Sequence, residues 1–324
     1  MFTLRFDMRA PDVGADRVEL YATALEMAAW CEDRGALMAI LSEHHGSADG
    51  YLPSPTVLAA AMAARTSRLP IAVMVTILPL HDPIQLAEDM CVIDILSRGR
   101  VSYVAGVGYR PEEYELYGVD FSRRGELADS KLPLLLAARS GEEFVHEGRL
   151  HRVTPAPHTP GGPSIAWGGG SVAAARRAGR HGIDFIAQRG GDQLREEYLA
   201  SARSAGHEPG VCFLPPDDMP TAVFVADDPD RAWDELAPYL MHDVTAYADW
   251  NRGAPASASM SGARTIDELR QQNSSHRVLT PVEARELIDR GEMLQLHPLI
   301  GGLPPEIAWR YLHTVTDDVI GAAS

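Results

Sequence analysis

The stretch IAVMVTILPLHDPIQLAEDMCVIDILSRGRVSYVAGVG, residues 71–108, contains a complete strand–helix–strand unit. Its first segment, Ile71–Leu78, is apolar on both faces, which is typical of a parallel strand covered by helices on both sides. A helix is expected from Pro83 to a point near Ser97, because proline favours the first helical position. A second apolar strand is expected over Val101–Gly108. The stretch therefore predicts a parallel βαβ unit.

The same alternation continues on both sides of this unit. The expected strands are Thr3–Met8, Leu37–Glu43, Ile71–Leu78, Val101–Gly108, Ser164–Gly170, Gly182–Ala187, Thr221–Ala226 and Met293–Ile300. About eight β-then-α units with no long β-only stretch predict an α/β fold, a closed (β/α)8 TIM barrel with insertions in its βα loops. An open doubly wound sheet is the alternative, but no G-x-G-x-x-G motif follows the first strand.

The middle and the end of the chain are less regular. Residues Glu143–His151 predict a small hairpin that turns at Glu147–Gly148. A helix is expected over Pro229–Met241. Residues Asn251–Ser275 are rich in Ala, Ser, Gly and Asn, and they predict a long mobile insertion. We expect residues 1–324 to form a single barrel domain, with this insertion at about 251–275.

Composition excludes several classes of protein. The 324 residues carry a formal net charge of -16, which argues against a general affinity for nucleic acid. No stretch approaches the roughly 20 apolar residues of a membrane helix, and the charged N-terminal segment is unlike a signal peptide, so a cytoplasmic protein is expected. The three cysteines have apolar flanks and no C-x-x-C motif, which favours buried thiols over disulfides or a zinc site.

Candidate catalytic residues follow the second strand, because active sites of barrels lie where strands end. Here the sequence reads Ser42-Glu43-His44-His45. Neighbouring side chains on a strand point to opposite faces, so the two histidines cannot both face one ligand, and no third metal ligand is evident. No metal site is expected. An imidazole at the barrel mouth beside Glu43 is suited to general acid–base chemistry; the alternative is a histidine satisfied by the backbone.

Two further segments lie at strand ends. Gly168–Gly170 form a glycine-rich turn, and Ser171 then caps a helix whose N-terminus is suited to a phosphate. A tight turn without a ligand explains the same glycines equally well. The segment GYRPEEYELYG, residues 108–118, is either the lining of a ligand mouth or a helical turn over the barrel rim, and the second interpretation is favoured.

Five segments together resemble the bacterial luciferase-like, flavin-dependent monooxygenase family. They are SEHH, LPLHDPIQLAEDMCVIDILSRGR, GVGYRPEEYELYG, IAWGGGS and LHPLIGGLPPEIAW. The resemblance runs over nearly the whole chain and is weakest over Asn251–Ser275. Each motif is degenerate alone, but five in the right order, each at an expected βα junction, are specific for the family. They do not specify a substrate.

The resemblance implies a reduced flavin at the C-terminal mouth of the barrel. Family members use reduced FMN from a separate flavin reductase, with O2 and a small-molecule substrate, or the deazaflavin F420. His44 matches the catalytic histidine, and Gly169, Gly170 and Ser171 match the phosphate-binding turn. A non-prolyl cis peptide is implied at Met74–Val75 or Val75–Thr76. The residues expected to bind the cofactor are Glu43, Met74, Val75, Thr76, Gly106, Val107, Arg110, Gly168, Gly169, Gly170 and Ser171.

One departure bears on the identity of the cofactor. Bacterial luciferase has an arginine for the flavin phosphate just after strand 4, where this chain has Val107, with Arg110 three residues on. Either Arg110 substitutes, or the phosphate rests on backbone groups alone. The Gly-Val-Gly sequence is also compatible with F420 enzymes. FMN is favoured because F420 enzymes more often carry Asp-His-Phe where this chain has Glu43-His44-His45.

The leading hypothesis is thus a monooxygenase that uses reduced FMN and O2. An F420-dependent hydride-transferring enzyme and a non-catalytic flavin-binding protein are the alternatives, and a metal-dependent hydrolase is disfavoured by the missing ligand set. The helices after strands 2 and 3 often form a dimer face in this family. Here they are rich in small and apolar residues, so a homodimer is expected, although a buried core would give the same pattern.

Overall fold

The main sheet of the computed structural model, which describes residues 1–216, 218–251 and 260–321, has ten parallel strands. They are β1 (Phe2–Phe6), β2 (Ala36–Leu41), β3 (Ile71–Ile77), β4 (Val101–Gly106), β7 (Ile165–Gly169), β8 (Phe185–Ala187), β9 (Cys212–Phe213), β10 (Ala222–Val225), β11 (His276–Leu279) and β12 (Leu294–Leu296). Their order is β11-β10-β12-β1-β2-β3-β4-β7-β8-β9. The first strand of the chain thus pairs with the last, as a barrel requires.

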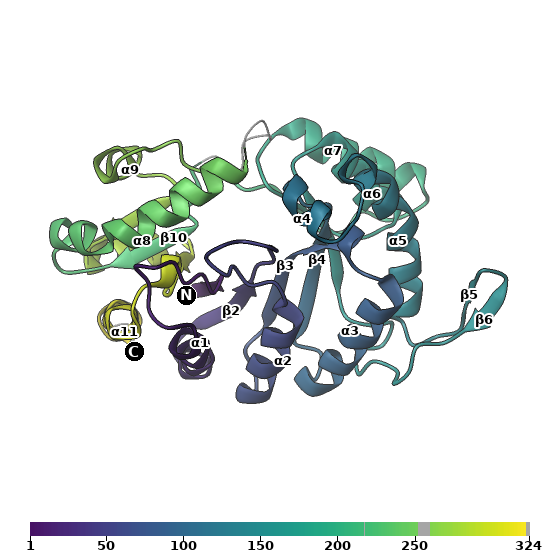
Figure 1. The fold of residues 1–324 in the computed structure, drawn as a ribbon, viewed down its shortest axis with the longest axis horizontal. Coiled ribbons are helices and arrows are strands. Elements are labelled where there is room, and N and C mark those ends of the chain that lie inside the picture. Colours follow the sequence, from purple (N-terminus) through teal and green to yellow (C-terminus); the bar gives the residue numbers. More distant parts are fainter. Residues whose placement is uncertain (217, 252–259, 322–324) are drawn as a thin grey trace.

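Helices cover the outside of the strands (Figure 1). They are α1 (Arg17–Cys31), α2 (Pro55–Arg65), α3 (Pro83–Ser97), α4 (Pro111–Leu116), α5 (Arg124–Ala138), α6 (Val172–Arg180), α7 (Asp192–Ser204), α8 (Pro229–Trp250), α9 (Ile266–Gln272), α10 (Pro281–Asp289) and α11 (Pro305–His313). Helix α3 begins as its sequence predicts, because Asp82 accepts hydrogen bonds from the first backbone N–H groups and Pro83 follows it. No helix among the described residues combines the length and the apolar composition needed to cross a bilayer.

The predicted (β/α)8 barrel is confirmed, with two short strands added. All eight expected strands are present, and β9 and β11 were missed. β9 has only two residues, too few for a periodic pattern, and β11 reads HRVL, in which only the last two residues are apolar. The hairpin of β5 (Phe144–His146) and β6 (Arg149–His151) is antiparallel as expected and projects from the barrel (Figure 1).

The region around the expected insertion contains more helix than the sequence predicted. Helix α8 does not stop at Met241 but continues to Trp250. Within 251–275, residues Ile266–Gln272 form α9, which begins where the Thr265 side chain accepts a hydrogen bond from the backbone of Glu268. Residues 252–259, on which part of the expectation rests, lie outside the described residues. The extension of α8 brings its last two turns to the barrel mouth.

Buried apolar side chains form a cluster that includes both ends of the fold, from Phe2 in β1 to Val319 near the C-terminus. Strands contribute residues such as Leu4 and Val73, and helices contribute residues such as Met27. This continuity is what a barrel formed by the whole chain would produce, and it holds the C-terminal strand ends in fixed positions.

Candidate active site

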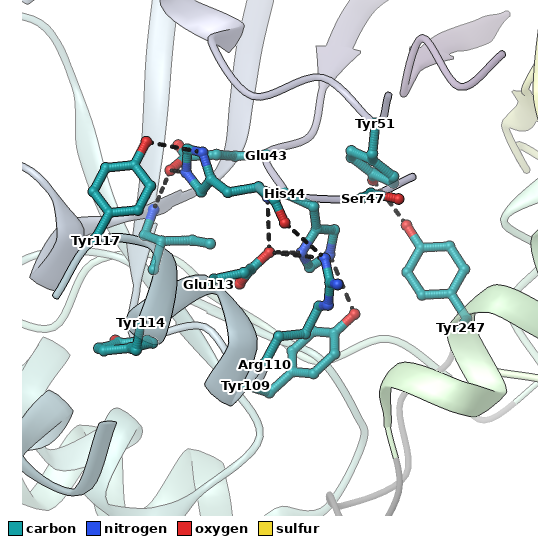
Figure 2. Close-up of polar contacts among 12 residues, drawn as sticks. Glu43, His44, Ser47, Tyr51, Tyr109, Arg110, Glu113, Tyr114, Tyr117 and Tyr247 are labelled. Carbon is teal, nitrogen blue, oxygen red and sulfur yellow. Dashed lines mark hydrogen bonds and ion pairs between the residues drawn. The ribbon is translucent and has the colours of Figure 1, made fainter. Parts of the chain in front are cut away.

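Three segments meet at the C-terminal ends of the strands: the loop after β2, the loop and α4 after β4, and the last turns of α8. Figure 2 shows side chains from all three gathered around His44. Tyr109 and Glu113 come from the β4 side, and Tyr247 comes from α8. The interpretation of residues 108–118 as a turn over the rim is right for their backbone, because Pro111–Leu116 form α4. Their side chains nevertheless line the site, which was not expected.

Both ring nitrogens of His44 have protein partners. Nδ1 lies 2.8 Å from Oε1 of Glu113, and Nε2 lies 3.2 Å from the hydroxyl of Tyr109. The rings of Tyr51 and Trp250 pack against the imidazole, with centroids 4.7 and 5.0 Å away. Burial lowers the pKa of His44 below its ordinary value, although Glu113 opposes this effect. Burial therefore favours the neutral form of the His44 imidazole.

Glu113 organises this half of the site. It is fully buried, and the same Oε1 atom also accepts from the backbone N–H of His45 at 2.9 Å and from Nη1 of Arg110 at 3.3 Å. Arg110 donates further to the carbonyl of His45 at 3.1 Å, and its guanidinium lies 4.2 Å from the ring centre of Trp250. By these contacts Arg110 belongs to the His44 side of the mouth, whereas the prediction placed it with the cofactor phosphate.

A second cluster surrounds Glu43. Its Oε1 atom lies 2.9 Å from Nε2 of His45 and 2.8 Å from Nε2 of His81, and it accepts from the backbone N–H of Ile77. Burial would raise the pKa of Glu43, but the two imidazoles outweigh it and lower the pKa to about 2. His44 and His45 therefore bond to different carboxylates, although β2 ends at Leu41, before either histidine.

The sequence did not reveal His81 as a member of this cluster. Glu43, His45 and His81 place three potential metal-ligating atoms within 4.8 Å of one another. The Glu43 oxygen forms a hydrogen bond with each imidazole, and the hydroxyl of Tyr117 lies 3.1 Å from the remaining nitrogen of His45. The arrangement joins the end of β2 to the loop after β3.

Val75 forms a bulge at the expected cofactor cradle. The pairing of β3 with β4 shifts between Met74 and Thr76, and the Met74–Val75 peptide is cis, at one of the two positions implied by the resemblance. A Cβ atom on Gly106 would lie 2.6 Å from Val75, and one on Gly168 would lie 3.2 Å from it. Both glycines therefore leave room for the Val75 side chain at the barrel mouth.

The expected phosphate turn joins β7 to α6. Gly169 has a positive φ of 144°, and the Ser171 side chain caps α6 by accepting from the backbone N–H of Ala174 at 3.2 Å. Nε of Arg189 donates to the carbonyl of Gly170 at 2.9 Å, so a cation that was not predicted lies beside the turn. Val107 is partly buried, and its carbonyl accepts from the Tyr114 hydroxyl.

A cavity of about 310 Å³ opens beside Trp250, whose ring packs against His44. It is lined by the loop after β2, by Arg110 and by the last turns of α8. The lining residues are Gly46, Ser47, Ala48, Asp49, Arg110, His242, Thr245, Ala246, Asp249 and Trp250. Polar side chains predominate among them, and the volume is at the small end of the range for ligand sites.

A buried charge cluster was also missed. Arg9 is fully buried and lies 3.2 Å from both Asp7 and Asp243, and His297 lies 3.3 Å from Asp7. Asp7 and Arg9 follow β1 and His297 follows β12, so the rule that selected His44 would have selected them too. Their partner Asp243 lies on α8, far away in the sequence, and nothing in the pattern linked it to them.

Several solved structures share this fold. The monooxygenase RslO1 of Streptomyces bottropensis matches with a TM-score of 0.77 at 20% identity, covering 100% of both chains. The oxygenating constituent of 3,6-diketocamphane monooxygenase of Pseudomonas putida, in complex with FMN, matches with a TM-score of 0.73 at 20% identity over 99% of this chain and 97% of that one. An F420-dependent secondary alcohol dehydrogenase matches at 0.65 and 15% identity, covering 98% and 99%.

Relatives found by sequence cover less of this chain than the solved structures do. A 4-hydroxyprotoasukamycin monooxygenase of Streptomyces nodosus subsp. asukaensis is 25% identical over 78% of this chain and 71% of its own. An uncharacterised Sinorhizobium fredii protein, y4vJ, is 29% identical over 41% of this chain and only 38% of its own length. The family model described as luciferase-like monooxygenase matches residues 4–309, nearly the whole chain. The chain belongs to the luciferase-like monooxygenase family.

Proposed function

We propose that this protein uses reduced FMN and O2 to oxygenate a small organic substrate. The observation that carries the proposal is the buried pair of His44 and Glu113, 2.8 Å apart, at the same end of the barrel as the cradle of Gly106 and Gly168. Family membership supports monooxygenase chemistry, and the pair supplies an acid–base group at the mouth.

The residues present fit a flavin. Side chains are absent at Gly106 and Gly168, where a Cβ atom would collide with Val75 and Val104 respectively. The first turn of α6, with Ser171 at its cap and Arg189 beside Gly170, offers backbone N–H groups and a cation to a phosphate. Bound reduced FMN would supply the electrons that reduce one oxygen atom of O2 to water while the other enters the substrate.

His44 supplies the proton chemistry in this proposal. A neutral imidazole accepts a proton, and the Glu113 carboxylate on Nδ1 stabilises the imidazolium that results. Arg110 holds Glu113 in place from the other side. The aromatic rings around His44 limit access of water to the imidazole.

The cavity favours a polar substrate. Its walls contain the Asp49–His242 pair, with Nε2 and Oδ2 2.7 Å apart, and among the described residues no Leu, Ile, Val, Met or Phe side chain lines it. Arg110 also lines the cavity, and its buried Nε atom has no hydrogen-bond partner among the described residues. A long unbranched hydrocarbon would find few apolar contacts in the cavity.

Anaerobic titration with reduced FMN and with reduced F420 tests the cofactor. We expect reduced FMN to bind more tightly, and binding of F420 alone would contradict the proposal. Small polar carbonyl compounds are then screened with reduced FMN and 18O2, and we expect one labelled oxygen atom in the product. FMN binding without any oxygenated product across the screen would favour a non-catalytic flavin-binding protein.

An F420-dependent enzyme is the second candidate. Val107 stands where the phosphate-binding arginine of luciferase would be, and an F420-dependent alcohol dehydrogenase has a similar fold. In that case substrate oxidation would reduce F420 and would consume no O2. Measuring O2 consumption with an oxygen electrode distinguishes this reaction from the proposed monooxygenation.

The proposed reaction implies partners. FMN must arrive reduced, so a separate flavin reductase is part of the proposal. We also propose a homodimer through α2 and α3, which pack together and carry exposed apolar side chains such as Val57 and Leu96. The cytoplasmic location stays a prediction.

A further inference from the structure

We propose that Tyr109 is the group through which His44 exchanges protons with the reacting atoms. The inference rests on the proposed function and concerns the path of the proton at the same site. Glu113, His44 and Tyr109 form a hydrogen-bonded series in which Tyr109 stands at the end (Figure 2). His44 is then a positioning residue, and the atom that meets the substrate is the Tyr109 hydroxyl oxygen.

Both nitrogens of His44 are already engaged, and their partners fix the direction of each hydrogen bond. The Glu113 oxygen already accepts from the His45 backbone and from Arg110, so it also accepts from His44, and Nδ1 of the imidazole carries the hydrogen. In a neutral imidazole Nε2 is then an acceptor. The Tyr109 hydroxyl, 3.2 Å from Nε2, must donate to it.

Access to His44 is also restricted. The residue is 7% exposed, and its ring is enclosed by Tyr51, Tyr109, Tyr247 and Trp250. Tyr109 is partly exposed and lies next in sequence to Arg110, which lines the cavity. Of the two linked side chains, the partly exposed Tyr109 is therefore more accessible to a ligand than the buried His44.

The proton balance closes without an ionised tyrosine. A proton from the substrate passes to the Tyr109 oxygen as the Tyr109 hydroxyl proton passes to Nε2 of His44. Tyr109 stays neutral, and His44 becomes an imidazolium next to the Glu113 carboxylate. The reverse sequence returns a proton. Burial raises the pKa of Tyr109 well above its ordinary value, although a hydrogen bond from Asn251 opposes this effect, so a free phenolate would be unfavourable here.

The first test needs no cofactor. Nitrogen NMR of histidine-labelled protein reports which His44 nitrogen carries the hydrogen. We expect the proton on Nδ1 and a hydrogen-bonded, unprotonated Nε2, and we expect Tyr109→Phe to shift the Nε2 resonance towards that of a free nitrogen. A proton on Nε2 in the unsubstituted protein would overturn the proposal, because His44 would then donate to Tyr109.

The second test measures turnover with reduced FMN and O2. Tyr109→Phe should lower turnover roughly 10²-fold, within the usual range for a lost acid–base group, and abolish the acid limb of the pH profile. Tyr109→Phe combined with His44→Ala should be no slower than the slower single variant. Full activity of Tyr109→Phe while His44→Ala is inactive would overturn the proposal, since His44 would then act directly.

Tyr117 provides a matched control. Its hydroxyl lies 3.1 Å from Nδ1 of His45, so Tyr117→Phe removes an equivalent Tyr–His contact from the neighbouring cluster. We expect this variant to shift a His45 resonance and to keep its turnover. An equal loss of turnover in Tyr117→Phe would count against a specific role for Tyr109. If the unsubstituted protein shows no FMN-dependent turnover, the proposed function fails, while the NMR result still decides the hydrogen-bond order.

Discussion

The proton affinity of His44 is set by opposing effects at one residue. Burial lowers its pKa, as do the charges of Arg110 and Arg9, while the Glu113 carboxylate raises it. Activity that needs a neutral imidazole should therefore fall only when the pH drops below the ordinary value for histidine. Glu113 keeps the imidazole basic enough to accept a proton in spite of its burial.

Glu113→Gln should shift the loss of activity at acid pH to still lower pH. The amide keeps an acceptor for Nδ1 but removes the charge that raises the pKa of His44, so the imidazole becomes a weaker base. We expect turnover to fall roughly 10²-fold. Turnover measured against pH checks both effects, and Glu112→Gln, on the exposed side of α4, should behave like the unsubstituted protein. Loss of activity at a higher pH in Glu113→Gln than in the unsubstituted protein would contradict a Glu113 charge that raises the pKa of His44.

Glu43→Gln tests stability at the second cluster. The pKa of Glu43 is lowered from 4.5 to about 2, so its carboxylate stabilises the fold above pH 4.5, and this contribution is lost as the pH falls towards 2. We expect the variant to lose roughly 3 kcal/mol of unfolding free energy at pH 7, because a buried pair is broken. Urea unfolding at several pH values measures the loss.

The outcome for Glu43 has a clear control. Glu126 forms an exposed ion pair with Arg123, and Glu126→Gln should leave the unfolding free energy nearly unchanged. The difference between the Glu43 variant and the unsubstituted protein should shrink in acid. A difference that stays constant down to pH 2 would mean that the charge of Glu43 contributes little.

At the scale of elements, the contact between β3 and β4 shapes the proposed cofactor cradle. Gly106→Ala should lower the unfolding free energy by roughly 1–3 kcal/mol, because the new Cβ would lie 2.6 Å from Cγ1 of Val75. We expect weaker binding of reduced FMN as well. Urea unfolding and equilibrium titration measure the two effects.

The cause can be isolated with a second substitution. Val75→Ala removes Cγ1, so the double variant with Gly106→Ala should regain part of the lost stability. A Cβ atom on Gly262 would meet no atom of the described residues within 4 Å, and the φ of Gly262 is not positive. Gly262→Ala should therefore leave stability within about 0.5 kcal/mol. Equal losses at the two glycines would remove packing against Val75 as the explanation.

At the scale of the whole molecule, the proposed dimer rests on α2 and α3. Leu96 is 52% exposed on α3, and Leu96→Glu would place a charge in the proposed interface. We expect light scattering to give twice the chain mass of 35.2 kDa for the unsubstituted protein and 35.2 kDa for the variant. Val145→Glu, on the projecting hairpin, should leave the dimer intact, and a monomeric unsubstituted protein would refute the proposal.

The sequence by itself determined the barrel and the identity of its strand ends. Alternating apolar strands and periodic helices are local signals, and they placed His44, Gly106 and Gly168–Ser171 at strand ends without any contact information. Local signals failed for β9 and β11, which are short or polar, and for the end of α8, where the pattern has no clear stop.

Only the tertiary structure decided which side chains meet. Glu113 reaches His44 across 69 positions of sequence, and Tyr247 and Trp250 come to the mouth because α8 is longer than its sequence suggested. The sequence of residues 108–118 predicted a helical turn over the barrel rim. It did not predict that Tyr109 and Glu113 would contact His44. Hydrogen bonds between distant segments depend on how strands and helices pack, and that packing leaves no periodic trace in either segment.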